Sequence, residues 1–309
     1  MEPLAAFLDR AGDGVPPLTS PTGPMARVDL HLHSTASDGA FPPEEVVARA
    51  SLAGLKAMAL TDHDTLEGVP AAIAAGNRLG IRVIAGCEFS TTAPWGEMHV
   101  LGYFLPLGWA PLEEFLSHCR ADRERRGADI VTRLNTLGVA LKMDDVLAES
   151  RGGSVGRPHV ARALLRTGMV RSVQEAFDRY IGWHRPAFVE KRLPSFAEVA
   201  ELVHTAGGVL SAAHLKDRGT RNILAGLKAQ GLDAVETRHP VHDPDQRARL
   251  TEIARQLGMH RSGGSDWHGD DPSLPPSGQI GGQDVPAEWL DALEAARPGQ
   301  REPAAHPAR

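Results

Sequence analysis

The chain has 309 residues, of which 42% are hydrophobic and 23% are charged, and its formal net charge is −6. This composition is typical of a globular protein and excludes a collagen-like or intrinsically disordered chain, while the negative charge argues against duplex DNA as a partner. Two cysteines, Cys87 and Cys119, are too few for a disulfide framework.

Residues 1–24 combine a short apolar stretch with a segment dense in glycine and proline, which predicts a flexible N-terminal extension. Met25 directly precedes the first predicted strand, so it stays open whether residues 1–24 belong to the native protein. The sequence lacks a secretory pattern and a run of roughly 18 apolar residues, so we expect a cytoplasmic protein with no membrane partner. Its oligomeric state is left open.

Short apolar runs alternate with amphipathic stretches over residues 25–106 and again over 191–297. This alternation is typical of βα units in a parallel sheet, and seven expected strands predict an α/β barrel or a large open sheet. Residues 107–190 instead show an apolar period of about 3.6 without a convincing strand, which predicts an inserted helical subdomain that caps the substrate. Residues 298–309 are polar and rich in proline, and we predict a disordered tail there.

Histidines and acidic residues follow the first two predicted strands. The first ends in His31-Leu32-His33, where strand alternation points both imidazoles to the same face, and Asp38 follows in a loop rich in serine and glycine. The second ends in Thr61-Asp62-His63-Asp64, an abrupt change from apolar to polar residues. An aspartate of this run can alternatively cap the next helix.

The same pattern recurs at the later predicted strand ends. Gly263 and Gly264 precede the last group and would let the backbone approach a crowded centre. A single histidine or glutamate would carry little weight, but its recurrence at successive strand ends indicates a common site. The residues are Glu88, His214, Glu236, His239, Asp266 and His268, together with His99 near the start of the fourth predicted strand.

In a βα barrel the C-terminal strand ends face one mouth, so these donors are expected to meet there. Imidazoles and carboxylates without a thiolate favour ions such as Zn²⁺, Mn²⁺ or iron, and the donors are too many for one ion. Clustered divalent ions would attract phosphate and acidify a bound water to a pKa of about 7 for phosphoester hydrolysis, with carbon–nitrogen hydrolysis left open. The candidate ligands are His31, His33, Asp38, His63, Glu88, His99, His214, Asp266 and His268.

The segments DLHLHSTASDG, LTDHDT and GGSDWHG resemble the polymerase and histidinol phosphatase (PHP) family over nearly the whole chain from Met25. The resemblance implies a distorted (β/α)7 barrel with a trinuclear metal centre. Mn²⁺ is the expected ion, with Zn²⁺, Fe²⁺ and Mg²⁺ as alternatives. It implies that Asp62 and Asp64 neighbour the ligands, while Glu236 and His239 support them or contact the substrate.

Two further segments, Gly156–Ala161 and Arg185–Val189, resemble the branch that removes the 3′-phosphate of nucleoside 3′,5′-bisphosphates; some relatives trim RNA from its 5′ end. They imply that Arg157, His159 and Arg185 contact substrate phosphate. Arg157 can alternatively be a surface residue at a helix start. The branch usually has Ala-His-Pro where this chain has Ala213-His214-Leu215, so two metals rather than three stay open. Phe188 replaces a tyrosine, which removes a hydroxyl group.

We therefore predict a metal-dependent phosphoesterase that hydrolyses the 3′-phosphate of nucleoside 3′,5′-bisphosphates through a hydroxide bridging two ions. Arg157 would hold the non-bridging oxygens, and His159 or a metal-site aspartate would protonate the leaving oxygen. The expected partner is a small nucleotide or a short RNA. The alternatives are a 5′-to-3′ exoribonuclease on short 5′-phosphorylated RNA, a histidinol-phosphate phosphatase and a non-catalytic metal-dependent sensor.

Overall fold

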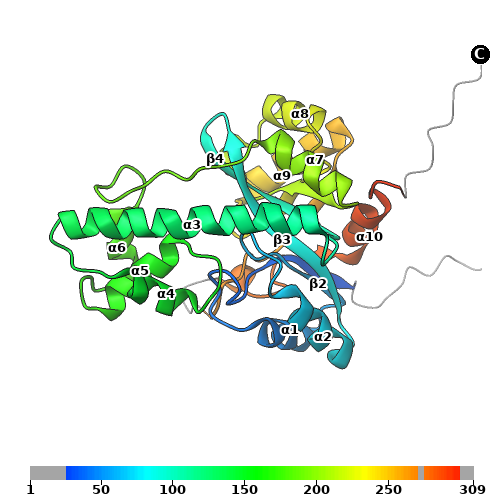
Figure 1. The fold of residues 1–309 in the computed structure, drawn as a ribbon. Helices are drawn as coiled ribbons and strands as arrows, with labels where there is room; N and C mark the ends of the chain where they lie inside the picture. The colour runs from blue at the N-terminus through cyan, green and yellow to red at the C-terminus, as the bar shows by residue number, and fades with distance from the viewer. Residues whose placement is uncertain (1–25, 271–274, 300–309) are drawn as a thin grey trace, which may run out of the picture.

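The computed structural model describes residues 26–270 and 275–299 (Figure 1). The predicted extension, residues 1–24, and the predicted tail from residue 300 onward lie outside these residues. The described strands form one sheet in the order β7-β6-β5-β4-β3-β2-β1-β8. They are β1 (Arg27–Leu32), β2 (Ala57–Leu60), β3 (Arg82–Ala93), β4 (Gly96–Tyr103), β5 (Val209–Ala212), β6 (Ala234–Arg238), β7 (His260–Gly263) and β8 (Val285–Pro286).

The sheet curls into a nearly closed barrel. β1, β2 and β3 pair in parallel, as do β5, β6 and β7, whereas β4 is antiparallel to both of its neighbours. Past the end of β7, the Asp266 N–H donates to the His31 carbonyl at 2.9 Å and the His33 N–H donates to the Trp267 carbonyl at 3.1 Å. These bonds join the two ends of the strand series and confirm the predicted α/β barrel. The short β8, antiparallel to β1, is an addition to the seven expected strands.

Helices from both halves of the chain pack around the barrel (Figure 1). Their starts follow local sequence signals: Ser195 and Glu198 form a capping box at α7, and Asp243 with Gln246 forms one at α9. Gly258 ends α9 in the left-handed conformation, with φ 59°. The helices are α1 (Pro43–Leu52), α2 (Val69–Leu79), α7 (Phe196–Thr205), α8 (Arg221–Ala229), α9 (Pro244–Leu257) and α10 (Ala287–Ala295), with 3₁₀ turns at Lys216–Arg218 and Pro276–Gly278.

A group of helices, here called the helical region, lies beside the barrel and is connected to it by the long α3 (Figure 1). It comprises α3 (Ala110–Thr136), α4 (Met143–Ser150), α5 (Arg157–Arg166) and α6 (Val173–Ala176), followed by a π-helical turn at Phe177–Ile181. Residues such as Leu134, Val160 and Ile181 form a hydrophobic cluster of its own. None of the helices in the described part of the chain has the length and apolarity needed to cross a membrane.

Candidate metal centre

The structure brings the predicted donors together at the end of the barrel where the parallel strands finish. His31 lies within β1, Glu88 within β3 and His99 within β4, while the other donors follow β1, β2, β5 and β7. Ligand atoms lie within 4.8 Å of one another in four overlapping groups that could each hold an ion. The groups are His33, Asp38, His63 and His268; His31, His33, Glu88 and Asp266; His63, Glu88 and His99; and His31, Glu236 and His239.

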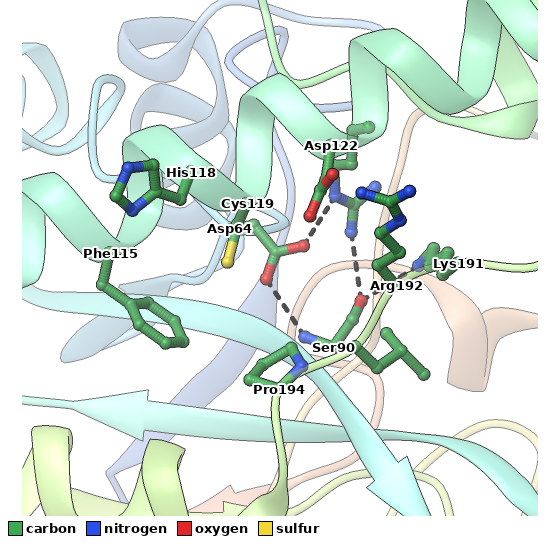
Figure 2. Close-up of a pocket in the computed structure, with 11 residues that line it drawn as sticks. Asp64, Ser90, Phe115, His118, Cys119, Asp122, Lys191, Arg192 and Pro194 are labelled. Atoms are coloured by element: carbon green, nitrogen blue, oxygen red, sulfur yellow. Dashed lines mark hydrogen bonds and ion pairs between the residues drawn. The ribbon is translucent and has the colours of Figure 1, made fainter.

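Two aspartates flank His63 and fix its surroundings. Asp62 accepts hydrogen bonds from the Ser34 N–H at 2.7 Å and from the hydroxyls of Ser34 and Ser37, both at 2.6 Å. It therefore holds the loop that carries Asp38. Asp64 accepts from the Ser90 N–H at 3.1 Å, as Figure 2 shows.

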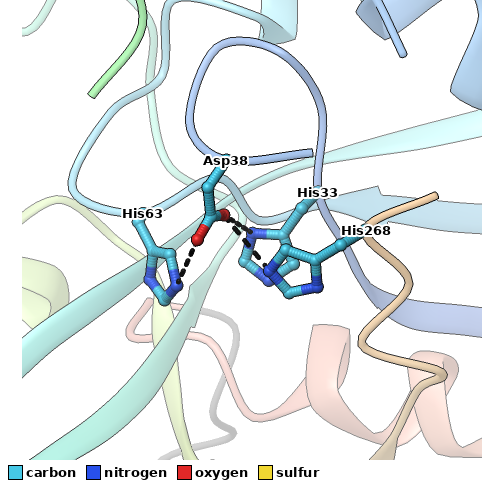
Figure 3. A group of neighbouring side chains, drawn as sticks. All are labelled: His33, Asp38, His63 and His268. Atoms are coloured by element: carbon cyan, nitrogen blue, oxygen red, sulfur yellow. Dashed lines mark ion pairs between the residues drawn. The ribbon is translucent and has the colours of Figure 1, made fainter. Parts of the chain in front are cut away.

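The first donor group surrounds Asp38 (Figure 3). The Asp38 carboxylate lies 3.1 Å from Nε2 of His268 and 3.9 Å from Nε2 of His63 and from Nδ1 of His33. Gly39 makes this turn possible, because a Cβ there would lie 2.8 Å from the carbonyl carbon of His33. The loop can thus fold back onto the strand end only with glycine at this position.

Glu88 is the centre of the whole arrangement. Its Oε2 lies 3.2 Å from His31 Nε2, 3.1 Å from His33 Nε2 and 3.2 Å from His63 Nδ1. Its Oε1 lies 2.8 Å from His99 Nδ1 and 3.0 Å from His214 Nε2. His214 thus reaches the cluster although proline is absent from the position that follows it. A carboxylate with imidazoles on both oxygens has the placement of a bridging ligand.

Asp266 completes the centre from the segment that follows β7. Asp266 Oδ1 lies 3.2 Å from His31 Nε2 and 3.1 Å from His33 Nε2. A Cβ at Gly264 would lie 2.4 Å from the Cβ of His31, so glycine is required for this approach.

Glu236 lies behind the other donors. Its carboxylate is 3.1 Å from His31 Nδ1 and accepts from the His214 N–H at 2.8 Å. The first contact orients the His31 ring, and the second fixes the backbone that carries His214. His239 Nε2 lies 3.3 Å from Asp266 Oδ2, so His239 also holds a donor of the cluster in place.

The electrostatics of the cluster fit cationic ligands. Burial opposes ionisation of Glu88, but the charges of His63, His31 and His99 hold its pKa well below its usual value. Three buried atoms, His33 Nε2, Asp38 Oδ1 and His63 Nδ1, form no hydrogen bond with the described residues. Buried polar atoms are normally satisfied, so these are candidates for metal coordination. The residues present therefore fit a group of divalent ions.

Arg123 and Lys191 are functional candidates that sequence reasoning missed. Arg123 Nε donates to Asp64 at 2.6 Å, and the Arg123 guanidinium also donates to the Ser90 hydroxyl at 3.2 Å. Lys191 donates to the same hydroxyl at 3.0 Å (Figure 2). Lys191 also pairs with Glu97, whose carboxylate lies 3.0 Å from His99 Nε2. Burial and the charge of Arg123 lower the pKa of Lys191 to about 8. This chain of contacts links α3 to the centre.

The three predicted phosphate contacts lie in different environments. His159 is buried: its Nδ1 accepts from the Gly156 N–H at 2.9 Å and its Nε2 donates to the Ser37 carbonyl at 3.0 Å. In this arrangement neither nitrogen is free for a phosphate or a leaving oxygen. Arg157 is half-buried near Phe188, with its guanidinium carbon 5.6 Å from the ring centre, and Arg185 is exposed.

A barrel with clustered imidazole and carboxylate donors at its mouth defines the class of metal-dependent hydrolases. The PHP domain matches residues 29–206, and the chain belongs to the PHP family. A 5′-3′ exoribonuclease of Haemophilus influenzae is 34% identical over 78% of this chain and 90% of the relative. A 3′,5′-nucleoside bisphosphate phosphatase of Chromobacterium violaceum is 30% identical over 79% of this chain and 88% of the relative.

A solved structure from Bifidobacterium adolescentis, named as a metal-dependent phosphoesterase, is similar with a TM-score of 0.80. Its sequence is 30% identical, and the match covers 88% of this chain and 96% of that one. The fold, the donor cluster and these relatives together make the protein a metal-dependent phosphoesterase of the PHP family.

Proposed function

We propose that the protein hydrolyses the 3′-phosphate of nucleoside 3′,5′-bisphosphates with two or three divalent ions, Mn²⁺ first among them. The observation that carries this proposal is the overlap of the donor groups, which share His31, His33, His63 and Glu88. Shared donors suit ions that lie side by side. The ligands we propose are His31, His33, Asp38, His63, Glu88, His99, His214, Asp266 and His268.

Divalent ions at such a centre supply an acidified water and polarise phosphoryl oxygens. The residues of this chain would hold and orient the reactants. Arg157 would bind a non-bridging phosphate oxygen, since its half-buried guanidinium lies within electrostatic reach of Glu97 at the edge of the donor cluster. Residues 107–190 would form the cap that carries Arg157 to the barrel mouth. His159 would position that cap through its bond to the Ser37 carbonyl.

The test is phosphate release from adenosine 3′,5′-bisphosphate by metal-stripped protein reconstituted with Mn²⁺. Histidinol phosphate is the comparison substrate. We expect rapid release from the bisphosphate alone. Equal or faster release from histidinol phosphate would contradict the proposal. Absence of phosphate release from both substrates, with bound metal confirmed by elemental analysis, would also contradict it.

A second candidate is 5′-to-3′ exoribonuclease activity on short 5′-phosphorylated RNA. It is favoured by the Haemophilus influenzae relative of that name, which is 34% identical to this chain. A labelled RNA distinguishes the two activities. A ladder of stepwise shortened products, formed as efficiently as phosphate is released from the bisphosphate, would establish the exonuclease.

A further inference from the structure

A pocket of about 180 Å³ adjoins the metal centre on the side of Glu97 and Lys191. Arg126, Trp183 and Phe188 also line it, so it lies between the barrel and the helical region. Glu97 forms part of the lining and also contacts His99, which joins this pocket to the donor cluster. A molecule bound here would therefore extend towards the metal centre.

Arg126 and Lys191 line this pocket, and Arg123 and Arg157 lie within electrostatic reach of Arg126. Arg123 pairs with Asp64, and Lys191 pairs with Glu97. Arg126 and Arg157 form no ion pair with a carboxylate among the described residues. Two neighbouring arginines without acidic partners favour an anionic ligand.

Arg126 is the more unusual of the two because it is only 5% exposed. Its Nε donates to the Val189 carbonyl at 2.7 Å, and its terminal amino groups form no further hydrogen bond within the described residues. Burial and the charge of Arg157 lower the pKa of Arg126 to about 10. An unpaired cation in this setting is costly, and a phosphate beside it would offset that cost. Glu190, the other acid in the lining, is exposed to solvent.

Aromatic rings lie next to these arginines. The guanidinium carbons of Arg126 and Arg157 are 5.8 and 5.6 Å from the centre of the Phe188 ring. Trp183 packs edge-on against Phe188 with ring centres 4.9 Å apart, and it is 55% exposed. An exposed indole beside these arginines offers a stacking surface for a nucleobase whose phosphate is bound by Arg126.

We propose that Arg126, Phe188 and Trp183 form a nucleotide anchor that binds the base and the phosphate that is not hydrolysed. This inference rests on the proposed function and adds to it the means by which a bisphosphate is recognised. Arg126 binds the second phosphate, Trp183 stacks on the base, and Arg157 stays available for the reacting phosphate. The reacting phosphate is then placed at the metal centre beyond Glu97.

The first test measures binding of adenosine 5′-monophosphate to the full-length protein without added metal, by calorimetry and by tryptophan fluorescence. Adenosine and inorganic phosphate are the comparison probes. Arg126→Gln should weaken binding of the monophosphate about 10- to 100-fold, the range expected for lost bonds to a charged group. Arg125→Gln is the matched control, because Arg125 lies on the same helix with its side chain 40% exposed and already pairs with Asp122 and Asp129.

Trp183→Phe keeps the test decisive if Arg126→Gln folds poorly. The nucleotide should quench the fluorescence of the wild type and of Trp289→Phe, and this quenching should be absent in Trp183→Phe. Binding by Arg126→Gln within about twofold of the wild type, or unchanged quenching in Trp183→Phe, would overturn the anchor.

Kinetics separate the anchor from the proposed function. With Mn²⁺-loaded enzyme, Arg126→Gln should raise KM for the bisphosphate about tenfold or more and change kcat much less. Hydrolysis with an unchanged KM would refute the anchor alone. Monophosphate binding that depends on Arg126, without hydrolysis of the bisphosphate by the wild type, would refute the proposed function and leave the anchor standing.

Discussion

At the residue scale, His63 connects two donor groups. Its Nδ1 lies 3.2 Å from Glu88 and its Nε2 lies 3.9 Å from Asp38. His63→Ala removes a ligand shared by both groups, so we expect kcat/KM to fall at least about 100-fold together with bound metal. Elemental analysis and steady-state kinetics check this. Measured without metal, the thermal midpoint should change little, because the ring lies among the other donors at the barrel mouth and not in the apolar core.

His118→Ala is the control for this prediction, since His118 is exposed on α3. It should keep wild-type metal content and activity. Full activity of His63→Ala would remove His63 from the centre.

Donors such as His33, His63 and His214 could be predicted from the sequence because they stand where an apolar strand becomes polar. Arg123 and Lys191 could not. Arg123 lies in a run of charged residues that is typical of an exposed helix, and its partner Asp64 is 59 positions away. Only the tertiary packing of α3 against the barrel buries Arg123. Lys191 similarly meets Glu97 from a segment 94 positions distant.

At the element scale, His159 anchors the start of α5 to the loop before Asp38. Burial lowers its pKa to about 4, so the ring is neutral in the folded protein near pH 7. The pKa of His159 in the folded protein is below its unfolded value of about 6.5. The stability that the neutral ring contributes is therefore fully present above pH 6.5 and is lost as pH falls towards 4. Lowering the pH from 7 to 5 should therefore reduce the free energy of unfolding by about 2 kcal/mol through His159 alone.

His159→Ala should lower the free energy of unfolding at pH 7 by about 2–3 kcal/mol, because two hydrogen bonds of a buried ring are lost. Its stability should also depend less on pH than that of the wild type. Urea titrations at pH 7 and pH 5 measure both effects. Parallel losses in the two proteins would show that His159 does not titrate in this range.

The elements themselves were predictable to different degrees. Long amphipathic segments such as α3 show their period directly, and the short connection before β4 predicts a strand without an intervening helix. β8 contains two residues, Val285 and Pro286, too few to show any alternation. Its position depends on pairing with Val28 and Arg27, which are far away in the sequence.

At the scale of the whole molecule, the donors meet only in the folded barrel, so metal binding should stabilise the fold. At a free Mn²⁺ concentration 100 times Kd, the free energy of unfolding should rise by about 2.7 kcal/mol, and a chelator should reverse this rise.

Acidic neighbours raise the pKa of His33 to about 10 and that of His99 to about 9, against the opposing effect of burial. Metal must displace these protons, so Mn²⁺ affinity should rise with pH. Thermal melts and calorimetric titrations at pH 6.5 and pH 8 check both effects, and an affinity that falls with pH would contradict this account.

The helical region and the barrel are joined by two ion pairs of different character. Asp64 and Arg123 form a buried pair at 2.6 Å, with side chains 4% and 7% exposed. Glu67 and Arg120 form an exposed pair at 3.2 Å that also involves α3. Asp64→Asn leaves Arg123 buried without its partner, so we expect a loss of about 3–5 kcal/mol in the free energy of unfolding.

Glu67→Gln is the matched control, and it should cost at most about 1 kcal/mol because solvent screens that pair. Urea unfolding measures the difference between the variants. Hydrogen exchange should locate the effect: in Asp64→Asn, amides of α3 should exchange faster, since their buried attachment to the barrel is weakened. Equal losses in the two variants would mean that the buried pair does not hold the helical region on the barrel.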